Sequence, residues 1–529
     1  MLSLIPIPKF YIESEGCFKL NDNVQIESEF DLKLLEGRAE IVDSSDFKIL
    51  RDDEINEEGY KLSVDKNSIT IKASTKTGAY YALQSIRKIG RLDLGERGIP
   101  CCEIDDEPRF KWRGVNFDEA RYFFGIETVK RLLDNMFSEK LNVLHWHLSD
   151  DQGWRIEIKK YPLLTEIGSK REYSQVGGWK SFKIDKTPHS GFYTQEQIKD
   201  IVEYARERGI MIVPEIDFPA HCASAIAAYK YLACFEKDTE VPGYFGGLIP
   251  QWRYFDWRWN RTVCCAKEST YEFIFGVLDE ICELFDSPYI HMGGDEAPQN
   301  EWKRCDKCQA LMRKEGLKNE FELQGWFENK LCNYLKSKGR KLIAWNEVLK
   351  SNEFNKEDKN TVVQYWTPKR DKKAEEYINS GGEAILSNHQ AFYFDMTYAE
   401  IPLRKTYSYT PEAFGINSKN IKNVLGYEGE LWSEWIADSE KLDLCAFPRL
   451  QALAELAWSP NEKIDFDDFK ARLDDYKPIF DKLGINYAVD KISLPESRKM
   501  IYRIMYKFHR GNPYLETELN KKYKAKGER

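Results

Sequence analysis

The chain has 529 residues, of which 42% are hydrophobic and 31% are charged, a balance that excludes a disordered or fibrous protein. This length exceeds what one compact core usually holds, so we expect a large domain and a smaller companion. The formal net charge of -9 argues against nucleic acid or an anionic membrane as a partner, because both require a basic face.

The beginning of the chain, MLSLIPIPKF, lacks a basic segment, and Pro6 and Pro8 interrupt its apolar run before it reaches the length of a signal peptide. No later stretch approaches the roughly 20 apolar residues that cross a bilayer. The 12 cysteines are sparse for so long a chain, so they are expected to be free thiols. We therefore expect a cytoplasmic protein with no membrane partner.

Residues 1–105 are predicted to form a small α/β domain. Short segments at 9–14, 24–28, 60–64 and 68–74 alternate between apolar and polar residues, as strands do. They are accompanied by the segment TGAYYALQSIRKIG, in which apolar side chains recur at helical spacing. Together these patterns predict a small sheet with one strong helix.

From about Arg113 the pattern changes to apolar strands that alternate with amphipathic helices, as in parallel βαβ units. Eight such strands can be counted. They are RGVNFD, NVLHWHL, IMIVPEID, YIHMGG, KLIAW, TVVQYW, EAILSNH and VLGYEGELW. Eight strands with interleaved helices predict a (β/α)8 TIM barrel over residues 106–463.

An open, doubly wound sheet is the main alternative to the barrel. It is disfavoured because no glycine-rich phosphate turn follows the first strand, and because polar residues follow the ends of many strands. Beyond the barrel, residues 464–529 are predicted to form C-terminal helices. Two insertions, residues 170–193 and 222–265, are expected to shape a site, and the second contains an aromatic stretch at 252–259.

Polar and aromatic side chains collect where the predicted strands end, which is the face on which barrels build their active sites. They are Asp118, Arg121, His145, His147, Asp150, Asp151, Glu215, Asp217, His221, Asp295, Glu296, Trp345, Glu347, Trp366, Tyr393, Asp395, Trp432 and Glu434. Aromatic rings stack on the apolar faces of a sugar, whereas carboxylates and arginine bind its hydroxyls. Because they do not form a metal-ligand set, these residues indicate a carbohydrate site without a cofactor or metal.

Asp295 and Glu296 are the strongest catalytic candidates. Neighbouring residues on a strand point to opposite faces, so both carboxylates can enter one pocket only where the strand ends and the chain turns. Gly293 and Gly294 allow such a turn. Two adjacent carboxylates repel each other, so one is expected to stay protonated near neutral pH, which suits a general acid.

The run HMGGDEAP resembles the catalytic strand of family 20 glycoside hydrolases, the β-N-acetylhexosaminidases. Five further segments are similar to motifs of that family and stand in its order. They are RGVNFDEARYFF, the run from KLNVLHWHL to GSKRE, VPEIDFPAH, LIAWNE and LGYEGELWSE. The similarity spans about residues 105–460, and six motifs in one order are far more specific than any single motif.

This resemblance implies a retaining exo-hydrolase that acts on terminal β-linked GlcNAc or GalNAc by substrate-assisted catalysis. Asp295 would orient the 2-acetamido group of the substrate. The acetamido oxygen would attack the anomeric carbon to give an oxazolinium intermediate, and Glu296 would act first as acid and then as base.

Matching motif positions also implies roles for other strand-end residues. Asp150, which is preferred over Asp151, and His221 would form a relay that tunes Glu296. Further residues would bind the terminal sugar: Arg121, Asp395 and Glu434 at its hydroxyls, Tyr393 at the acetamido oxygen, and Trp345, Trp366 and Trp432 as the walls of the pocket.

Simpler interpretations exist for some residues. Arg121 alone could be a surface ion-pair partner, and each tryptophan could belong to the core. His145 and His147 alternate on one strand and are interpreted as structural. Cys305 and Cys308 form a C-x-x-C motif that could bind zinc, with Cys264, Cys265 and Cys332 as further ligands, but packing on a helix is favoured.

Two other functions remain open at this point. One is a non-catalytic sugar-binding barrel, which the presence of Glu296 disfavours. The other is a glycosidase of different specificity, such as a β-glucosidase, a disaccharide-releasing enzyme or one that prefers 6-sulfated sugars. The expected partner is an oligosaccharide or glycoconjugate that ends in β-GlcNAc or β-GalNAc, and the sequence is compatible with a homodimer that completes the rim of the site.

Overall fold

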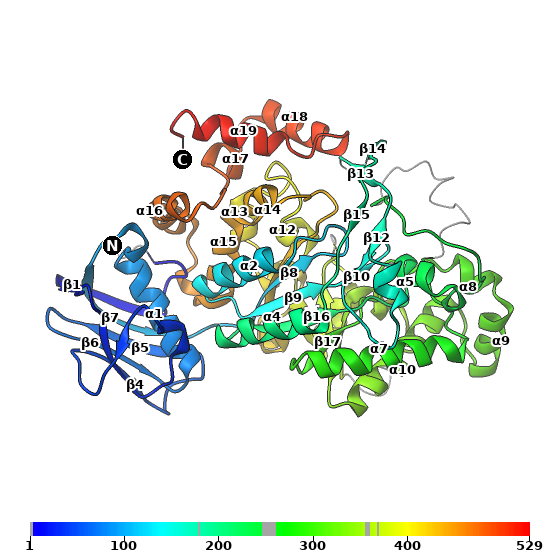
Figure 1. Cartoon of the computed structure of the whole chain (residues 1–529), viewed down its shortest axis with the longest axis horizontal. Helices are drawn as coiled ribbons and strands as arrows, with labels where there is room; N and C mark the ends of the chain where they lie inside the picture. Colours follow the sequence, from blue (N-terminus) through cyan, green and yellow to red (C-terminus); the bar gives the residue numbers. More distant parts are fainter. Residues whose placement is uncertain (1–3, 178–179, 246–260, 355–359, 368–369, 529) are drawn as a thin grey trace.

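The computed structural model describes residues 4–177, 180–245, 261–354, 360–367 and 370–528. The aromatic stretch at 252–259 lies outside these residues. A small N-terminal domain lies at one end of an elongated molecule, the barrel occupies its centre, and the C-terminal helices lie along one side (Figure 1).

The N-terminal domain is a seven-stranded sheet in the order β1-β7-β5-β6-β4-β2-β3. Its strands are β1 (Phe10–Lys19), β2 (Gln25–Ser28), β3 (Glu40–Ile41), β4 (Phe47–Arg51), β5 (Tyr60–Val64), β6 (Ile69–Ala73) and β7 (Gly98–Asp106). Helix α1 (Lys76–Ile89) packs against β5 and β6, and the Thr75 side chain caps its first turn by accepting from the Gly78 amide. Four of these strands, β1, β2, β5 and β6, were predicted from the sequence, whereas β3, β4 and β7 were not.

The central domain is a closed barrel of eight parallel strands, as predicted. In barrel order from the first strand along the chain they are β8 (Trp112–Asp118), β9 (Val143–His147), β16 (Met211–Glu215), β17 (Tyr289–His291), β18 (Lys341–Trp345), β19 (Val362–Tyr365), β20 (Glu383–Leu386) and β21 (Val424–Leu431). β21 pairs with β8 over six residues, which closes the ring. Every strand end on the C-terminal side therefore faces one common centre.

Amphipathic helices surround the barrel and bury one face each. The longest of them are α2 (Ile126–Ser138), α4 (Gln195–Glu207), α7 (Glu268–Leu284) and α10 (Glu320–Ser337). On α2, Val129, Leu133 and Met136 are fully buried, as their helical spacing predicted. The loop between β9 and α4 contributes short paired strands, including β10 (Ser149–Asp150), above the barrel.

Buried ion pairs join the small domain to the barrel. Lys140 Nζ lies 2.9 Å from Asp106 Oδ2, and Lys88 Nζ lies 3.0 Å from Glu139 Oε2. After β21 the chain continues through further helices: α14 (Ser439–Ala446), α15 (Arg449–Trp458), α16 (Phe466–Leu483), α17 (Asp490–Ser493), α18 (Arg498–His509) and α19 (Leu515–Lys524). This confirms the predicted fold class, a barrel between a small α/β domain and C-terminal helices.

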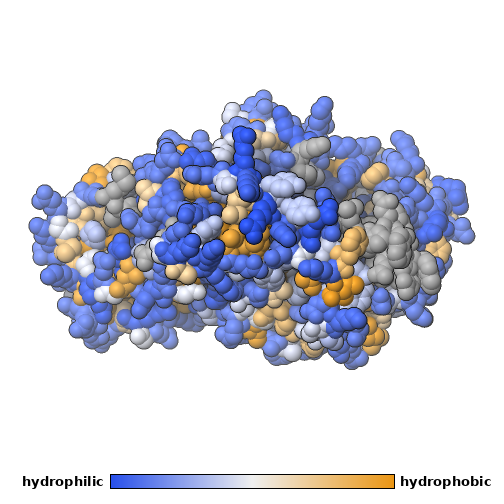
Figure 2. Space-filling view, turned by 90° about the horizontal axis from the view of Figure 1, so that it is seen from above, coloured by the Kyte–Doolittle hydropathy of each residue, from blue (hydrophilic) through white to orange (hydrophobic). Residues whose placement is uncertain are grey.

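No helix among the described residues is long and apolar enough to span a bilayer. The face drawn in Figure 2 is largely hydrophilic, and its hydrophobic side chains form small, separate groups. Such scattered groups are ordinary for a protein surface.

Candidate active site

Eleven residues were given catalytic or sugar-binding roles from the sequence, and ten of them line one pocket at the C-terminal end of the barrel. They are Arg121, His221, Asp295, Glu296, Trp345, Trp366, Tyr393, Asp395, Trp432 and Glu434, and the pocket has a volume of about 250 Å³. Asp150, the eleventh, is buried beside it and contacts both Arg121 and His221. The barrel thus brings together residues that are more than 300 positions apart in the sequence.

The turn after β17 carries both catalytic candidates into this pocket. Gly293 and Gly294 have φ angles of +68° and +91°, and Glu296 has a φ of +45°. A Cβ atom on Gly293 would lie 1.8 Å from Asp217 Oδ1, so no larger residue fits there. Asp217 Oδ1 also accepts a hydrogen bond of 3.2 Å from the Gly294 amide, which fixes the turn.

His221 stands between the catalytic candidates and Asp150. Its Nε2 lies 3.7 Å from Asp295 Oδ2 and 3.8 Å from Glu296 Oε2, while its Nδ1 lies 3.2 Å from Asp150 Oδ1. Burial would lower the pKa of His221, but the charges of Asp150 and Asp295 outweigh it and raise that pKa well above its usual value. Asp151 Oδ2 is more distant from Nδ1, at 3.7 Å, so the geometry favours Asp150 as the partner.

Asp295 is the more buried of the two carboxyl groups, and its pKa is raised. Its side chain is 19% exposed, whereas that of Glu296 is 55% exposed. Burial raises the pKa of Asp295 to about 7; the charge of His221 opposes this, and Glu296 and Glu347 add to it. Repulsion between the neighbouring carboxylates was predicted to raise one pKa, but burial is the larger cause for Asp295.

Four aromatic rings form the walls of the pocket. The ring centroids of Trp345 and Trp432 lie 5.7 Å apart, those of Tyr393 and Trp432 lie 6.2 Å apart, and those of Trp366 and Tyr393 lie 6.0 Å apart. These rings belong to a cluster separate from the main hydrophobic core. They are therefore walls of the site and not general core residues.

Several polar atoms in this pocket are buried and have no hydrogen-bond partner within the described part of the chain. They are Asp295 Oδ1, Trp366 Nε1, His389 Nδ1, Asp395 Oδ1, Trp432 Nε1 and Glu434 Oε2. Buried polar atoms are rarely left unpaired in a folded protein unless a ligand or water completes them. Burial also raises the pKa of Glu434 to about 7, although Arg121 opposes this, and it raises that of Asp395 well above the usual range.

Arg121 is fixed at the base of the pocket by two acidic partners. Its Nη2 lies 2.7 Å from Asp150 Oδ2, and its Nη1 donates to Asp118 Oδ2 at 3.2 Å. The guanidinium carbon also lies 5.1 Å from the ring centroid of Trp432. Arg121 is thus buried and oriented by the site, which argues against the interpretation as a surface ion-pair partner.

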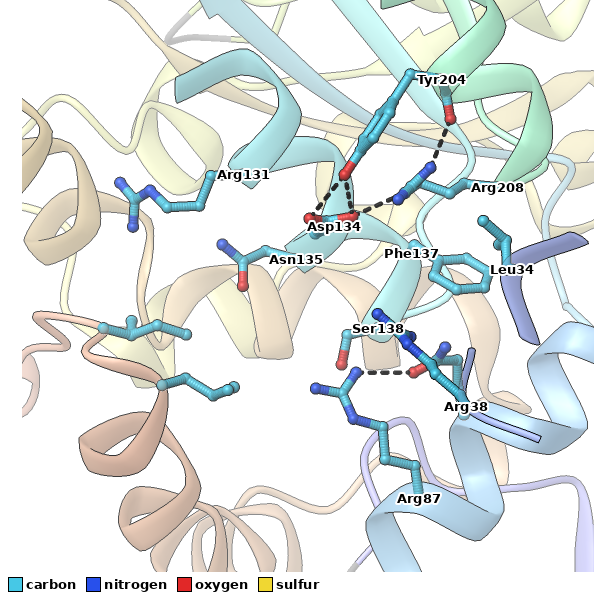
Figure 3. A pocket seen from close by; sticks show the side chains of 13 residues that line it. Leu34, Arg38, Arg87, Arg131, Asp134, Asn135, Phe137, Ser138, Tyr204 and Arg208 are labelled. Carbon is cyan, nitrogen blue, oxygen red and sulfur yellow. Dashed lines mark hydrogen bonds and ion pairs between the residues drawn. The ribbon is translucent and has the colours of Figure 1, made fainter. Parts of the chain in front are cut away.

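A second cavity lies between the small domain and the barrel, where Arg38, Arg87, Arg131 and Arg208 are found near Asp134 (Figure 3). Three of these arginines are already paired. Arg87, Arg131 and Arg208 lie 2.8, 2.7 and 2.7 Å from Asp93, Asp443 and Asp134, respectively. This cavity is lined by none of the strand-end residues, so it is not the candidate active site.

Comparison with known proteins gives the family. The model of glycosyl hydrolase family 20, catalytic domain, matches residues 110–461, and the model of its domain 2 matches residues 28–107. The chain belongs to glycoside hydrolase family 20. The resemblance that the six motifs indicated is thereby confirmed, and the carboxylate pocket is that of a glycoside hydrolase.

Relatives of this family 20 hydrolase cover most of its length. A β-hexosaminidase of Porphyromonas gingivalis is 35% identical over 94% of the chain, which spans 65% of that protein. One from Vibrio furnissii is 34% identical over 86% of the chain and 76% of its own length. The solved structure of a β-N-acetylhexosaminidase from Bacteroides fragilis has a TM-score of 0.80 at 30% identity, covering 92% of this chain and 96% of that one.

Three residues that had no role assigned from the sequence also belong to the site of the family 20 hydrolase. Asp217 supports the glycine turn, Glu347 accepts a 2.9 Å hydrogen bond from the Glu296 amide, and His389 lines the pocket beside Tyr393. All three stand at the ends of predicted strands, and Asp217 and Glu347 were among the polar residues expected there. Position at a strand end thus indicated two of them but could not show which contacts they make.

His145 and His147 take part in a buried network below the pocket, as the structural interpretation predicted. His145 Nδ1 lies 2.8 Å from Glu428 Oε1, and His147 contacts Glu215. Glu215 Oε1 in turn accepts a hydrogen bond of 2.8 Å from Trp345 Nε1. The network thus orients one aromatic wall of the site.

Proposed function

We propose that this family 20 hydrolase is a retaining exo-β-N-acetylhexosaminidase that uses the acetamido group of its substrate as the nucleophile. The observation that carries the proposal is the side-by-side placement of Asp295 and Glu296, both within 3.8 Å of one histidine nitrogen. In a conventional retaining glycosidase the two carboxyl groups flank the bond about 5–5.5 Å apart. Because Asp295 and Glu296 are neighbours on one turn, they fit two other roles better: Glu296 as the acid/base and Asp295 as the group that orients the acetamido nitrogen.

The proposed reaction has two steps, each of which inverts the anomeric carbon. In the first, Glu296 donates a proton to the glycosidic oxygen while the acetamido oxygen attacks the anomeric carbon and the alcohol leaves. The Asp295 carboxylate accepts a hydrogen bond from the acetamido N–H and stabilises the positive charge of the oxazolinium. In the second, Glu296 takes a proton from water, which opens the ring and gives the β-product.

The shape of the pocket supports recognition of one terminal sugar. Trp345, Trp366 and Trp432 offer apolar surfaces, and the unpaired atoms of Asp395 and Glu434 offer hydrogen bonds to hydroxyls. The aromatic wall beside Asp295 suits the methyl group of an acetamido substituent. The substrate class we propose is therefore terminal β-GlcNAc and β-GalNAc on oligosaccharides or glycoconjugates.

A panel of nitrophenyl glycosides tests this proposed function. We expect rapid hydrolysis of the β-GlcNAc and β-GalNAc glycosides and none of the β-glucoside or β-galactoside, because only the former carry the nucleophile. Nitrophenyl lacto-N-bioside and 6-sulfated GlcNAc glycosides separate the disaccharide-releasing and sulfate-preferring alternatives. Faster hydrolysis of either of these, or of the β-glucoside, would contradict the proposed specificity.

The pKa of Asp295 predicts an acidic limb in the pH profile. Asp295 must be ionised to stabilise the oxazolinium, and its pKa of about 7 means that it gains a proton as the pH falls through that value. We therefore expect kcat/KM to decrease below about pH 7. Because the charge of His221 lowers this pKa, His221→Gln should move the limb to higher pH.

The pH profile is measured as kcat/KM on a nitrophenyl β-GlcNAc glycoside for wild type and variant. His509→Gln is the matched control, because His509 pairs with Glu400 and does not line the pocket. The acidic limb of the His509→Gln profile should lie at the same pH as that of the wild type. A His221→Gln limb that stays in place, or moves to lower pH, would refute the proposed coupling.

A further inference from the structure

Four cysteine side chains from three separate segments meet beside the active-site loops. Cys234 follows the 3-10 helix η3 (Lys230–Leu232), Cys264 precedes α7, and Cys305 and Cys308 stand at the start of α9 (Asp306–Glu315). Cys264, Cys305 and Cys308 are buried, and Cys234 is partly buried. Cys264 was a predicted candidate partner of the C-x-x-C motif, whereas Cys234 was not.

The distances within this cysteine cluster are those of a tetrahedral metal site. Cys264 Sγ lies 3.7 Å from Cys308 Sγ and 4.0 Å from Cys305 Sγ, and Cys234 Sγ lies 3.8 Å from Cys308 Sγ. All four sulfurs lie within 4.8 Å of one another. Zinc–sulfur bonds of about 2.3 Å in a tetrahedron place the sulfurs about 3.8 Å apart.

Disulfide pairing explains this arrangement less well. A disulfide would bring two sulfurs to about 2.0 Å and leave the others outside. Here Cys264 has two sulfur neighbours near the tetrahedral distance, and so does Cys308. A shared central ion accounts for all of these contacts at once.

The surroundings of the cluster favour thiolates. Cys305 is the N-cap residue of the ten-residue helix α9, and Cys308 lies in its first turn, where free amide groups and the helix dipole stabilise negative charge. These features offset the charge of -2 that four thiolates and one Zn²⁺ would carry.

We propose that Cys234, Cys264, Cys305 and Cys308 bind one Zn²⁺ as a structural site. Binding releases a proton from each thiol, and four protein ligands leave no open position for water or substrate, so the ion takes no part in hydrolysis. This proposal departs from the expectation of a metal-free protein. Cys265 and Cys332, which the sequence analysis also considered, are not members of the cluster.

The zinc ion would cross-link the loop that carries His221 and the loop that carries Asp295 and Glu296. Trp302 Nε1, on the segment between Glu296 and Cys305, donates to the Val263 carbonyl at 2.9 Å. The Val263 amide donates to the Pro219 carbonyl at 2.9 Å, next to the turn of His221. A metal bound by both Cys264 and Cys305 would therefore link the loop of His221 to the loop of Glu296.

The test is a metal analysis of the full-length protein, purified without an affinity tag or chelator. We expect about one zinc ion per chain, with zinc–sulfur bonds of about 2.3 Å by X-ray absorption spectroscopy. Cys308→Ser should lose most of the zinc. Cys265→Ser is the matched control: Cys265 is adjacent to Cys264 and equally buried but lies outside the cluster, so this variant should keep its zinc.

Two measurements on the wild type keep the proposal testable if Cys308→Ser does not fold. Replacement of the metal by Co²⁺ should produce the intense thiolate-to-cobalt absorption of a tetrahedral cysteine site. Removal of zinc should lower the melting temperature, and added zinc should restore it. Purified protein without zinc, iron in its place, disulfides among these cysteines, or a cobalt spectrum without thiolate bands would each overturn the proposal.

Discussion

Replacing Glu296 with Gln is expected to lower kcat/KM by about 10²–10⁴-fold for alkyl β-GlcNAc glycosides, whose alcohols are poor leaving groups. The amide keeps the size of the side chain but cannot give a proton to the glycosidic oxygen. Activated aryl glycosides depend less on that proton, so they should lose less in the first step. Comparing the two substrate types isolates the acid role, because a general loss of folding would affect both equally.

Glu301→Gln is the matched control for this substitution. Glu301 lies in α8 (Asn300–Arg304), five residues beyond Glu296, and does not line the pocket. It should retain wild-type kcat/KM on both substrate types. Azide should restore part of the turnover of Glu296→Gln on an activated substrate, because an anionic nucleophile needs no general base. Equal losses on both substrate types, with no rescue by azide, would argue against Glu296 as the acid/base.

Replacing Asp295 with Asn is expected to lower kcat by about 10²–10³-fold, the usual effect of removing one preorganised group that stabilises the transition state. An amide cannot neutralise the oxazolinium charge, and one of its two orientations presents the wrong atom to the acetamido N–H. The same variant should bind a thiazoline inhibitor more weakly, because that molecule copies the cyclised acetamido group.

Both quantities are measured on purified protein whose thermal unfolding matches that of the wild type. The inhibition constant distinguishes this role from a structural one, since a misfolded fraction would lower kcat without changing inhibition of the active fraction. The variant should also lose the acidic limb near pH 7, because the titrating group is gone. Wild-type kcat, or unchanged inhibition by the thiazoline, would contradict the role proposed for Asp295.

The barrel could be predicted because its parallel strands are buried on both faces and form continuous apolar runs between polar helix starts. All eight predicted strands coincide with barrel strands, and β8 is buried over its whole length. The small domain was harder to predict. β3 has only two residues, and β7 pairs with β1 at the opposite end of the domain's sequence, in a polar, cysteine-containing segment without clear apolar alternation.

Most of the pocket could be predicted because a closed barrel brings all strand ends to one centre. The protonation of Asp295 depends on different information, because burial raises its pKa and the charge of His221 opposes that rise. Neither burial nor the position of His221 relative to the turn can be read from neighbouring residues. The sequence therefore pointed to repulsion as the cause of a raised pKa, whereas burial is the larger cause and repulsion by Glu296 adds to it.

The members of the cysteine cluster could not be predicted from the sequence. Cys305 and Cys308 have the spacing of a metal-binding pair, but Cys264 lies 41 residues before Cys305 and Cys234 lies 74 residues before Cys308, both within the insertion at 222–265. Only the folded path of that insertion shows that Cys234 joins and that Cys265, beside Cys264, does not. Spacing rules apply to short loops, so they could not select these partners.

Participation of the substrate's acetamido oxygen is the central claim, and a series of β-glycosides with mono-, di- and trifluorinated acetyl groups tests it most directly. Each fluorine makes that oxygen a weaker nucleophile while leaving the sugar ring and the leaving group unchanged. We expect kcat/KM to fall steeply along the series, with the β-anomer as the first product seen by NMR. Rates that are independent of fluorination, or an α-anomer formed first, would contradict the proposed mechanism.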